Sequence, residues 1–156
     1  FKSAQMPSLS VSHQQQQQQS DCLAASASMV LEYLHIRVDY KRLIRLLRVG
    51  PIGTAFGNLA ELRRLGVTVL IESGTSADVR RFLASGLPVI VFLDTAELAY
   101  WKYEHTDHAA VVIGIDEQNV RLNDPEFREA PQVCSIGEFE LAWLEKDNLF
   151  AVIMLT

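Results

Sequence analysis

The sequence predicts an α+β fold, because helical patterns come mainly first along the chain and strand patterns come mainly last. Ala- and Leu-rich stretches dominate residues 20–65, whereas short apolar runs separated by turn residues dominate the remainder. Helices and strands do not alternate as they do in a parallel βαβ arrangement. We therefore expect N-terminal helices packed on a mainly antiparallel sheet. A chain of 156 residues with no internal repeat fits one domain.

The first 19 residues form a polar arm that ends in six consecutive glutamines at positions 14–19. A run of this kind has no apolar face to bury and is typical of low-complexity sequence. The composition changes sharply at Ser20 and Asp21. We therefore expect a Gln-rich arm over 1–19 and a single folded domain over 20–156.

Three helices are expected in the first half of the domain. The first covers 22–34 behind a cap at Ser20 or Asp21, and its nearly continuous apolar residues predict burial on most sides. The second follows Asp39 and carries basic residues on its outer face. After a turn at 50–53, the third opens at Thr54 and stops at Gly66.

Strands and two further helices complete the domain. Apolar runs of strand length predict strands over 67–71, 87–93, 108–115, 120–123 and 149–155. Helices are expected over 76–85 and 135–144. The tight turn at 116–119 joins its two neighbouring strands into a hairpin.

Charge and cysteine content exclude several classes of function. The 14 basic and 19 acidic side chains give a net charge of −5, which favours solubility and argues against nucleic acid or an anionic membrane as partner. The longest apolar runs are strand-sized, and no secretory signal follows Phe1, so we expect no membrane span and a cytoplasmic location. Two cysteines, Cys22 and Cys134, are too few for a disulfide scaffold or a thiolate zinc site.

Cys22 is the first candidate for chemistry, because it lies in the first turn of a helix. A thiol in this position is close to the positive end of the helix dipole and to free backbone N–H groups, which favour the nucleophilic thiolate. A lone cysteine in an Ala-rich helix is more often a small core residue. Position alone therefore leaves both interpretations open.

His108 and Asp124 are the second and third candidates. His108 begins an apolar strand, where an imidazole can face a cleft and exchange a proton with a thiol. Asp124 follows the returning strand, and a separation of 16 residues suits a hairpin that places the two side chains together. Its carboxylate could then orient the ring. The alternatives are an unpartnered histidine and an Asp-Pro pair that merely ends a strand.

Several motifs together resemble the C39-like cysteine peptidases. They are the Gln run, Asp21-Cys22 before an Ala-rich helix, the segment His-Ala-Ala-Val-Val-Ile-Gly-Ile-Asp at 108–116, and Asn-Asp-Pro at 123–125. This family has a papain-like fold and is related to the peptidase domains of bacteriocin-exporting transporters. The resemblance covers the chain from about Gln14 onward. It implies a Cys22, His108 and Asp124 triad.

The resemblance also implies an oxyanion donor about six residues before the nucleophile, which is Gln16 here. An amide donor there has a physical role, because negative charge builds on the carbonyl oxygen during thiolate attack. The glutamine run leaves Gln15 and Gln17 open as alternatives. Transporter-type members usually carry Gly directly after the nucleophile, whereas this chain has Leu23.

We therefore expect a thiol hydrolase that cleaves a peptide or amide bond in a peptide or protein substrate, with no metal or cofactor. The transporter relatives cut after a Gly-Gly pair, so by analogy of fold a narrow cleft would select small residues. Two alternatives stay open: an acyl transferase or deamidase on the same fold, and a papain-like binding module without catalysis. Cys134 has no histidine near it in sequence and is interpreted as structural.

Overall fold

The structure, a computed structural model, describes residues 8–156. The α-helices are α1 (Cys22–Tyr33), α2 (Tyr40–Leu46), α3 (Ser76–Ala84) and α4 (Ile136–Leu144). Four 3₁₀ segments are η1 (Gln19–Asp21), η2 (Phe56–Leu65), η3 (Thr95–Glu97) and η4 (Ala99–Trp101). The strands are β1 (Val67–Ser73), β2 (Val89–Asp94), β3 (Asp107–Ile115), β4 (Asn119–Asn123), β5 (Gln132–Ser135) and β6 (Leu149–Leu155).

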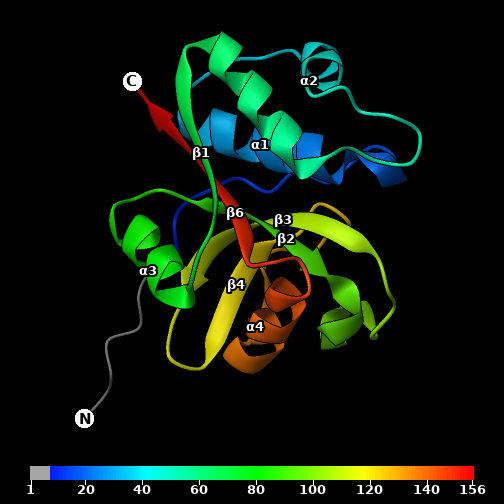
Figure 1. Ribbon diagram of the computed structural model, residues 1–156, viewed down its shortest axis with the longest axis vertical. Helices are drawn as coiled ribbons and strands as arrows, with labels where there is room; N and C mark the ends of the chain where they lie inside the picture. The colour runs from blue at the N-terminus through cyan, green and yellow to red at the C-terminus, as the bar shows by residue number, and fades with distance from the viewer. Residues whose placement is uncertain (1–7) are drawn as a thin grey trace.

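The strands form one six-stranded sheet in the order β1-β6-β2-β3-β4-β5, and every pairing is antiparallel. Helices α1 and α2 cover one side of this sheet and α3 and α4 the other (Figure 1). The predicted α+β class with a mainly antiparallel sheet is therefore confirmed.

Strand β3 is buried on both faces, which explains its unbroken apolar sequence. Ala109, Val111 and Ile113 belong to the core shared with α1 and α2. Ala110 and Val112 alternate with them and belong to the core shared with α3 and α4. Successive side chains of a strand point to opposite faces of the sheet, so a strand covered by helices on both faces needs apolar residues at every position. The same burial fixes its register and so the place of His108 at its edge.

The third expected helix and strand β5 differ from the sequence expectations, and the short 3₁₀ segments η1, η3 and η4 were not predicted. The helix expected over 54–65 is the 3₁₀ segment η2, since Gly57 and Asn58 near its start disfavour regular α-helix. It ends at Gly66, whose φ of 85° is the left-handed conformation that glycine commonly adopts after the last residue of a helix. Strand β5 was not predicted, because its four residues show no clear alternation and only Cys134 is buried.

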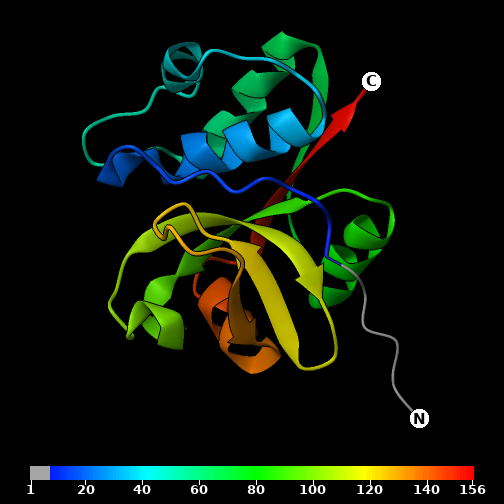
Figure 2. The same cartoon turned by 180° about the vertical axis from the view of Figure 1, so that it is seen from behind.

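The described part of the N-terminal arm, residues 8–19, lies between α1 and the sheet (Figure 2). The Leu9 amide donates to the Ile113 carbonyl at 2.8 Å, and the Asn123 side chain donates to the Val11 carbonyl at 2.9 Å. Val11 is only 8% exposed. The arm therefore contributes to the core. Residues 1–7 lie outside the described residues, and the predicted division of the chain at residue 20 stays a prediction.

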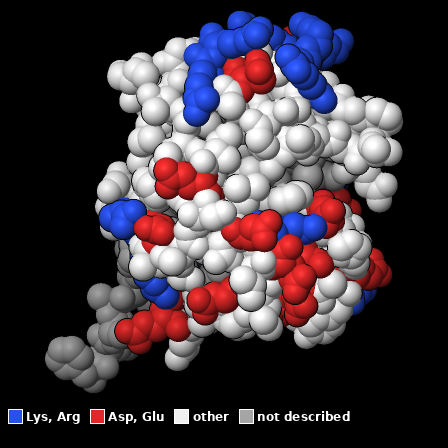
Figure 3. Space-filling view, in the orientation of Figure 1, with Lys and Arg blue, Asp and Glu red and all other residues white. Residues whose placement is uncertain are grey.

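Within residues 8–156, no helix combines the length and the apolar character that a bilayer crossing requires. Charged side chains are unevenly distributed on the face seen in Figure 3. Lys and Arg gather at the end that carries α2 and η2, whereas Asp and Glu gather over the part that carries the sheet.

Candidate active site

Cys22 is the first residue of α1 and follows directly on η1. Asp21 occupies the N-cap position, but its side chain makes no capping bond to the helix. It is instead buried and accepts a hydrogen bond from the Tyr40 hydroxyl at 3.4 Å. The expectation of a side-chain cap is therefore wrong at Asp21, because the carboxylate turns toward α2. The first backbone N–H groups of α1 are left without a capping side chain from this residue.

His108 and Asp124 are brought together by the β3–β4 hairpin. Val111 pairs with Asn123 in the ladder, so the residue after β4 returns beside the start of β3. The His108 Nε2 atom lies 2.6 Å from Asp124 Oδ1. His108 is 2% exposed and Asp124 is fully buried. The contact predicted from the 16-residue spacing is present.

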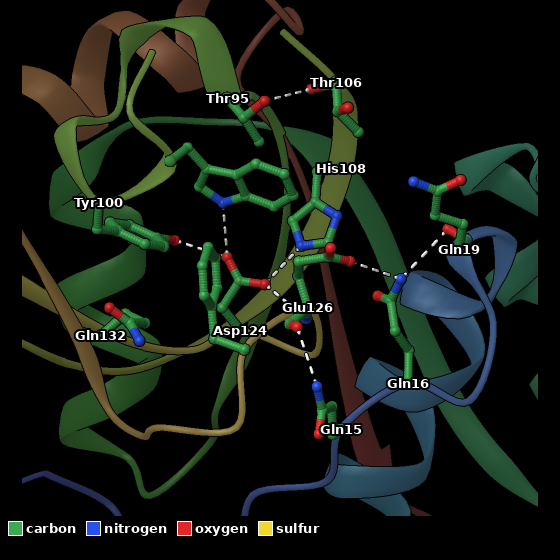
Figure 4. A network of polar contacts seen from close by, with 12 residues as sticks. Gln15, Gln16, Gln19, Thr95, Tyr100, Thr106, His108, Asp124, Glu126 and Gln132 are labelled. Carbon is green, nitrogen blue, oxygen red and sulfur yellow. Dashed lines mark hydrogen bonds and ion pairs between the residues drawn. The ribbon is translucent and has the colours of Figure 1, made fainter. Parts of the chain in front are cut away.

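Asp124 accepts hydrogen bonds from three further groups. The Tyr100 hydroxyl and the Trp101 indole N–H donate to Oδ2 at 2.8 and 3.0 Å, and the Glu126 amide donates to Oδ1 at 3.0 Å. Figure 4 shows the carboxylate between Tyr100 and His108. Tyr100 and Trp101 were missed by the sequence reasoning. The only available signal was a pair of aromatic residues in an otherwise polar loop before the His108 strand.

Aromatic rings enclose the His108–Asp124 pair. The Trp101 ring meets the His108 ring edge-on, with centroids 4.8 Å apart and planes at 65°. Phe127 packs edge-on against both Tyr100 and Trp101, at centroid distances of 5.4 and 5.3 Å. These rings exclude water from the pair and lower the local dielectric, which strengthens the attraction between its charges.

Both members of the pair are charged at neutral pH. Burial lowers the pKa of His108, but the charge of Asp124, the hydrogen bond between them and the nearby Cys22 side chain raise it to about 10. Burial raises the pKa of Asp124, whereas His108 and the donors Glu126 and Trp101 together hold it below its usual range. The imidazolium is therefore the resting form beside Cys22.

Cys22 and His108 line one cleft of about 580 Å³. Leu23, Phe56 and Phe92 form apolar parts of its wall, while Gln16 and Glu126 form polar parts. Because His108 bonds Asp124 through Nε2, the other ring nitrogen, Nδ1, is the one left to exchange a proton with Cys22. In Figure 4 this second nitrogen points away from Asp124, toward the side where Gln16 and Gln19 lie.

Gln16 is fixed in the cleft by contacts with the segment after β4. Its backbone amide donates to the Pro125 carbonyl at 2.7 Å, and its side-chain Nε2 donates to Glu126 Oε2 at 3.0 Å. Its Oε1 atom is buried without a hydrogen-bond partner among the described residues. Gln15 instead contacts the Glu126 carbonyl, and Gln17 lines a different cavity. Of these three glutamines, Gln16 alone lines the cleft with Cys22.

A comparison with family models finds that residues 8–149 match the model described as the Peptidase_C39 like family. The chain belongs to this family. The match begins within the Gln-rich arm and includes Gln16, Cys22, His108 and Asp124. Among curated proteins, none matches the sequence closely enough to count as a relative.

Solved structures with the same fold include further C39 peptidases. A Bacillus anthracis protein assigned as a C39-like peptidase superposes with a TM-score of 0.80 at 17% identity, covering 96% of this chain and 98% of that one. A double glycine motif protease from an AMS/PCAT transporter, solved with its leader peptide, gives 0.76 at 19% identity, covering 96% and 94%. The peptidase domain of Streptococcus ComA gives 0.72 at 18% identity, covering 92% and 98%. At identities of 17–19%, these structural matches show that the chain has the C39 peptidase fold and no more.

The second cysteine of this C39-like chain and its histidines His13 and His105 do not line the cleft. Cys134 is buried in β5, and burial, followed by the charge of Glu138, raises the pKa of its thiol to about 12. His13 contacts the Phe127 carbonyl at 2.6 Å, and His105 pairs with Asp94 at 2.8 Å. Within residues 8–156, no three His, Cys, Asp or Glu side chains gather as metal ligands.

Proposed function

We propose that this chain is a cysteine peptidase that cleaves a peptide or amide bond through Cys22, His108 and Asp124. The single observation that carries the proposal is the buried His108–Asp124 pair, held at 2.6 Å, in the same cleft as a cysteine at the start of α1. Membership of the Peptidase_C39 like family supports this assignment.

In the first step, the Cys22 sulfur attacks the carbonyl carbon of the scissile bond as a thiolate. The proton that left the thiol is held by His108, whose pKa of about 10 keeps the ring charged at neutral pH. As the tetrahedral intermediate collapses, His108 gives this proton to the leaving amine, and a thioester remains on Cys22. The neutral ring then takes a proton from water, the hydroxide attacks the thioester, and the acid leaves.

Asp124 keeps the ring in position through both steps. Its carboxylate bonds Nε2 and balances the imidazolium charge, so that Nδ1 stays directed to the reacting atoms. Gln16 Nε2 and the Cys22 backbone N–H would donate to the carbonyl oxygen as it becomes negative. Gln16 Nε2 now donates to Glu126 Oε2 at 3.0 Å and to the Gln19 carbonyl at 3.3 Å, so this role requires it to exchange one of these bonds for one with the substrate.

A peptide or protein is the proposed substrate. One structural neighbour is a double glycine motif protease solved in complex with a leader peptide. By analogy of fold, small residues next to the scissile bond are expected here as well. Leu23 directly follows Cys22, is buried, and lines the cleft, so it narrows the space beside the nucleophile.

Thiol labelling tests the proposal without a known substrate. The protein is treated with iodoacetamide between pH 6 and 8, and both cysteines are followed by peptide mass spectrometry. Cys22 should react much faster than Cys134, because Cys22 lies in the cleft beside His108, whereas Cys134 is buried and burial raises the pKa of its thiol to about 12. The His108→Ala variant should label Cys22 more slowly than the unmodified protein does, whereas the control His105→Ala should keep the Cys22 rate unchanged; Cys134 should stay slow in all three proteins, because it is buried. Equal, slow labelling of both cysteines in the unmodified protein would rule out a nucleophilic Cys22.

A further inference from the structure

The cleft carries negative charge beside the reacting groups. Apart from His108, the charged side chains among its lining residues are Asp107 and Glu126, and no Lys or Arg lines it in the described part of the chain. Asp107 is 54% exposed in its side chain and pairs with Lys146, so its charge is offset. Glu126 forms no ion pair with any Lys, Arg or His of residues 8–156.

Glu126 is held in place at three points and is not a freely solvated side chain. Its amide donates to Asp124 Oδ1 at 3.0 Å, and its carbonyl accepts from Gln15 Nε2 at 3.2 Å. Its carboxylate accepts from Gln16 Nε2 at 3.0 Å. Figure 4 shows this carboxylate between His108 and Gln16. The chain thus fixes a negative charge one hydrogen bond away from the proposed oxyanion donor.

A charge in this place works against cleavage of a neutral substrate. Negative charge develops on the carbonyl oxygen during attack, and a nearby carboxylate repels it in a site partly shielded from water. A positive group on the substrate would pair with Glu126, offset this repulsion and free the Gln16 amide. The site therefore favours a substrate that carries a positively charged group near the scissile bond.

We propose that Glu126 is a specificity-determining residue that selects peptides with a cationic group close to the scissile bond. The inference rests on the proposed peptidase function. The cation is an ammonium or guanidinium group, which a Lys or Arg side chain or a free peptide N-terminus could supply.

Matched peptides test the selection. Each peptide carries Lys, Gln or Glu at one position flanking the cleaved bond, with the N-terminus either free or acetylated. For a partly exposed ion pair we expect kcat/KM to be about fivefold higher for the cationic member than for the neutral one. A preference that survives acetylation assigns the cation to the side chain, and one that acetylation removes assigns it to the N-terminus.

Variants of Glu126 connect the preference to this residue. Glu126→Gln keeps an oxygen acceptor for Gln16 but removes the charge, so the preference should disappear. Glu126→Lys should reverse it in favour of the Glu peptide. Glu129→Gln, an exposed change in the same segment, is the matched control and should keep the preference of the unmodified protein.

A second readout does not depend on peptide cleavage. Cationic and anionic methanethiosulfonate reagents are reacted with Cys22, and each rate is divided by the rate with free cysteine. The cationic reagent should be favoured, and Glu126→Gln should lower that ratio about fivefold. Failure to cleave any peptide would overturn the peptidase function, while this ratio still decides the role of Glu126. An unchanged ratio in Glu126→Gln would overturn the selection itself.

Discussion

Replacing Asp124 by Asn is expected to lower the pKa of His108 from about 10 to below its ordinary value of 6.5. The reason is that burial alone lowers this pKa, and the charge of Asp124 is the main influence that raises it. In the variant, the buried imidazole would therefore be neutral at pH 7. Catalysis should fall steeply, because a neutral ring neither stabilises the thiolate nor protonates the leaving amine.

The loss of folding free energy in Asp124→Asn follows from the difference between the ordinary pKa of histidine and the raised pKa of His108 in the folded protein. A rise from 6.5 to about 10 corresponds to roughly 5 kcal/mol of stabilisation of the imidazolium. Loss of one partner of a buried pair costs about 3–5 kcal/mol of folding free energy. We expect the lower end, about 3 kcal/mol, because His108 can lose its proton instead of remaining charged and unpaired.

The stability difference between the unmodified protein and Asp124→Asn should depend on pH. The His108 contribution is complete below 6.5, where the unfolded ring is also charged, and is lost as the pH rises through about 10. The Asp124 contribution is present above 3.8 and is lost as the pH falls through its lowered pKa. The difference should therefore be largest between about pH 4 and 6.5.

Two measurements check this prediction. NMR titration of the His108 ring gives its pKa in both proteins, and urea denaturation at pH 5.5, 7 and 9.5 gives the free energy of unfolding. Asp39→Asn, at an exposed N-cap without a side-chain capping bond, is the control for loss of a carboxylate. A His108 that titrates at or below 6.5 in the unmodified protein would refute the reasoning, as would an unchanged pKa in Asp124→Asn.

Three further predictions concern individual side chains. Trp101→Phe removes one indole donor to the triad carboxylate but keeps a ring over the pair, so urea denaturation should show a loss of about 1–3 kcal/mol; an unchanged stability would mean that this bond contributes nothing. Cys134→Ala should keep peptidase activity, whereas Cys22→Ala should abolish it, and the reverse result would assign the nucleophile to β5. Gln16→Ala should lower kcat by about 10²–10³-fold, while Gln17→Ala should change it less than about twofold; equal losses would show that the register within the glutamine run is wrong.

The backbone of the site could be predicted from the sequence, because local patterns determine it. The hairpin spacing predicts that His108 and Asp124 lie at the same end of the two strands, and they are in contact there, although the sequence does not show the register shift between Val112 and Gly114. The place of Cys22 follows from the sharp change in composition at the start of α1. These features depend on residues that are close in sequence.

The rest of the site depends on contacts between distant segments. Tyr100 and Trp101 lie in a loop without periodicity, and only the folded chain shows that both donate to Asp124. The composition of the arm suggests low complexity, yet Gln16 is fixed by Pro125, more than 100 residues away. The contact between Glu126 and Gln16 has no sequence signature for the same reason.

The most direct test of the account is cleavage of a peptide library by the unmodified protein beside the Cys22→Ala and His108→Ala variants. Mass spectrometry follows new termini, and intact-mass analysis of the rapidly quenched protein follows an acyl group on Cys22. We predict cleavage and a Cys22 thioester in the unmodified protein and neither in the two variants. Cleavage that persists in Cys22→Ala would contradict the central claim that this sulfur attacks the scissile bond.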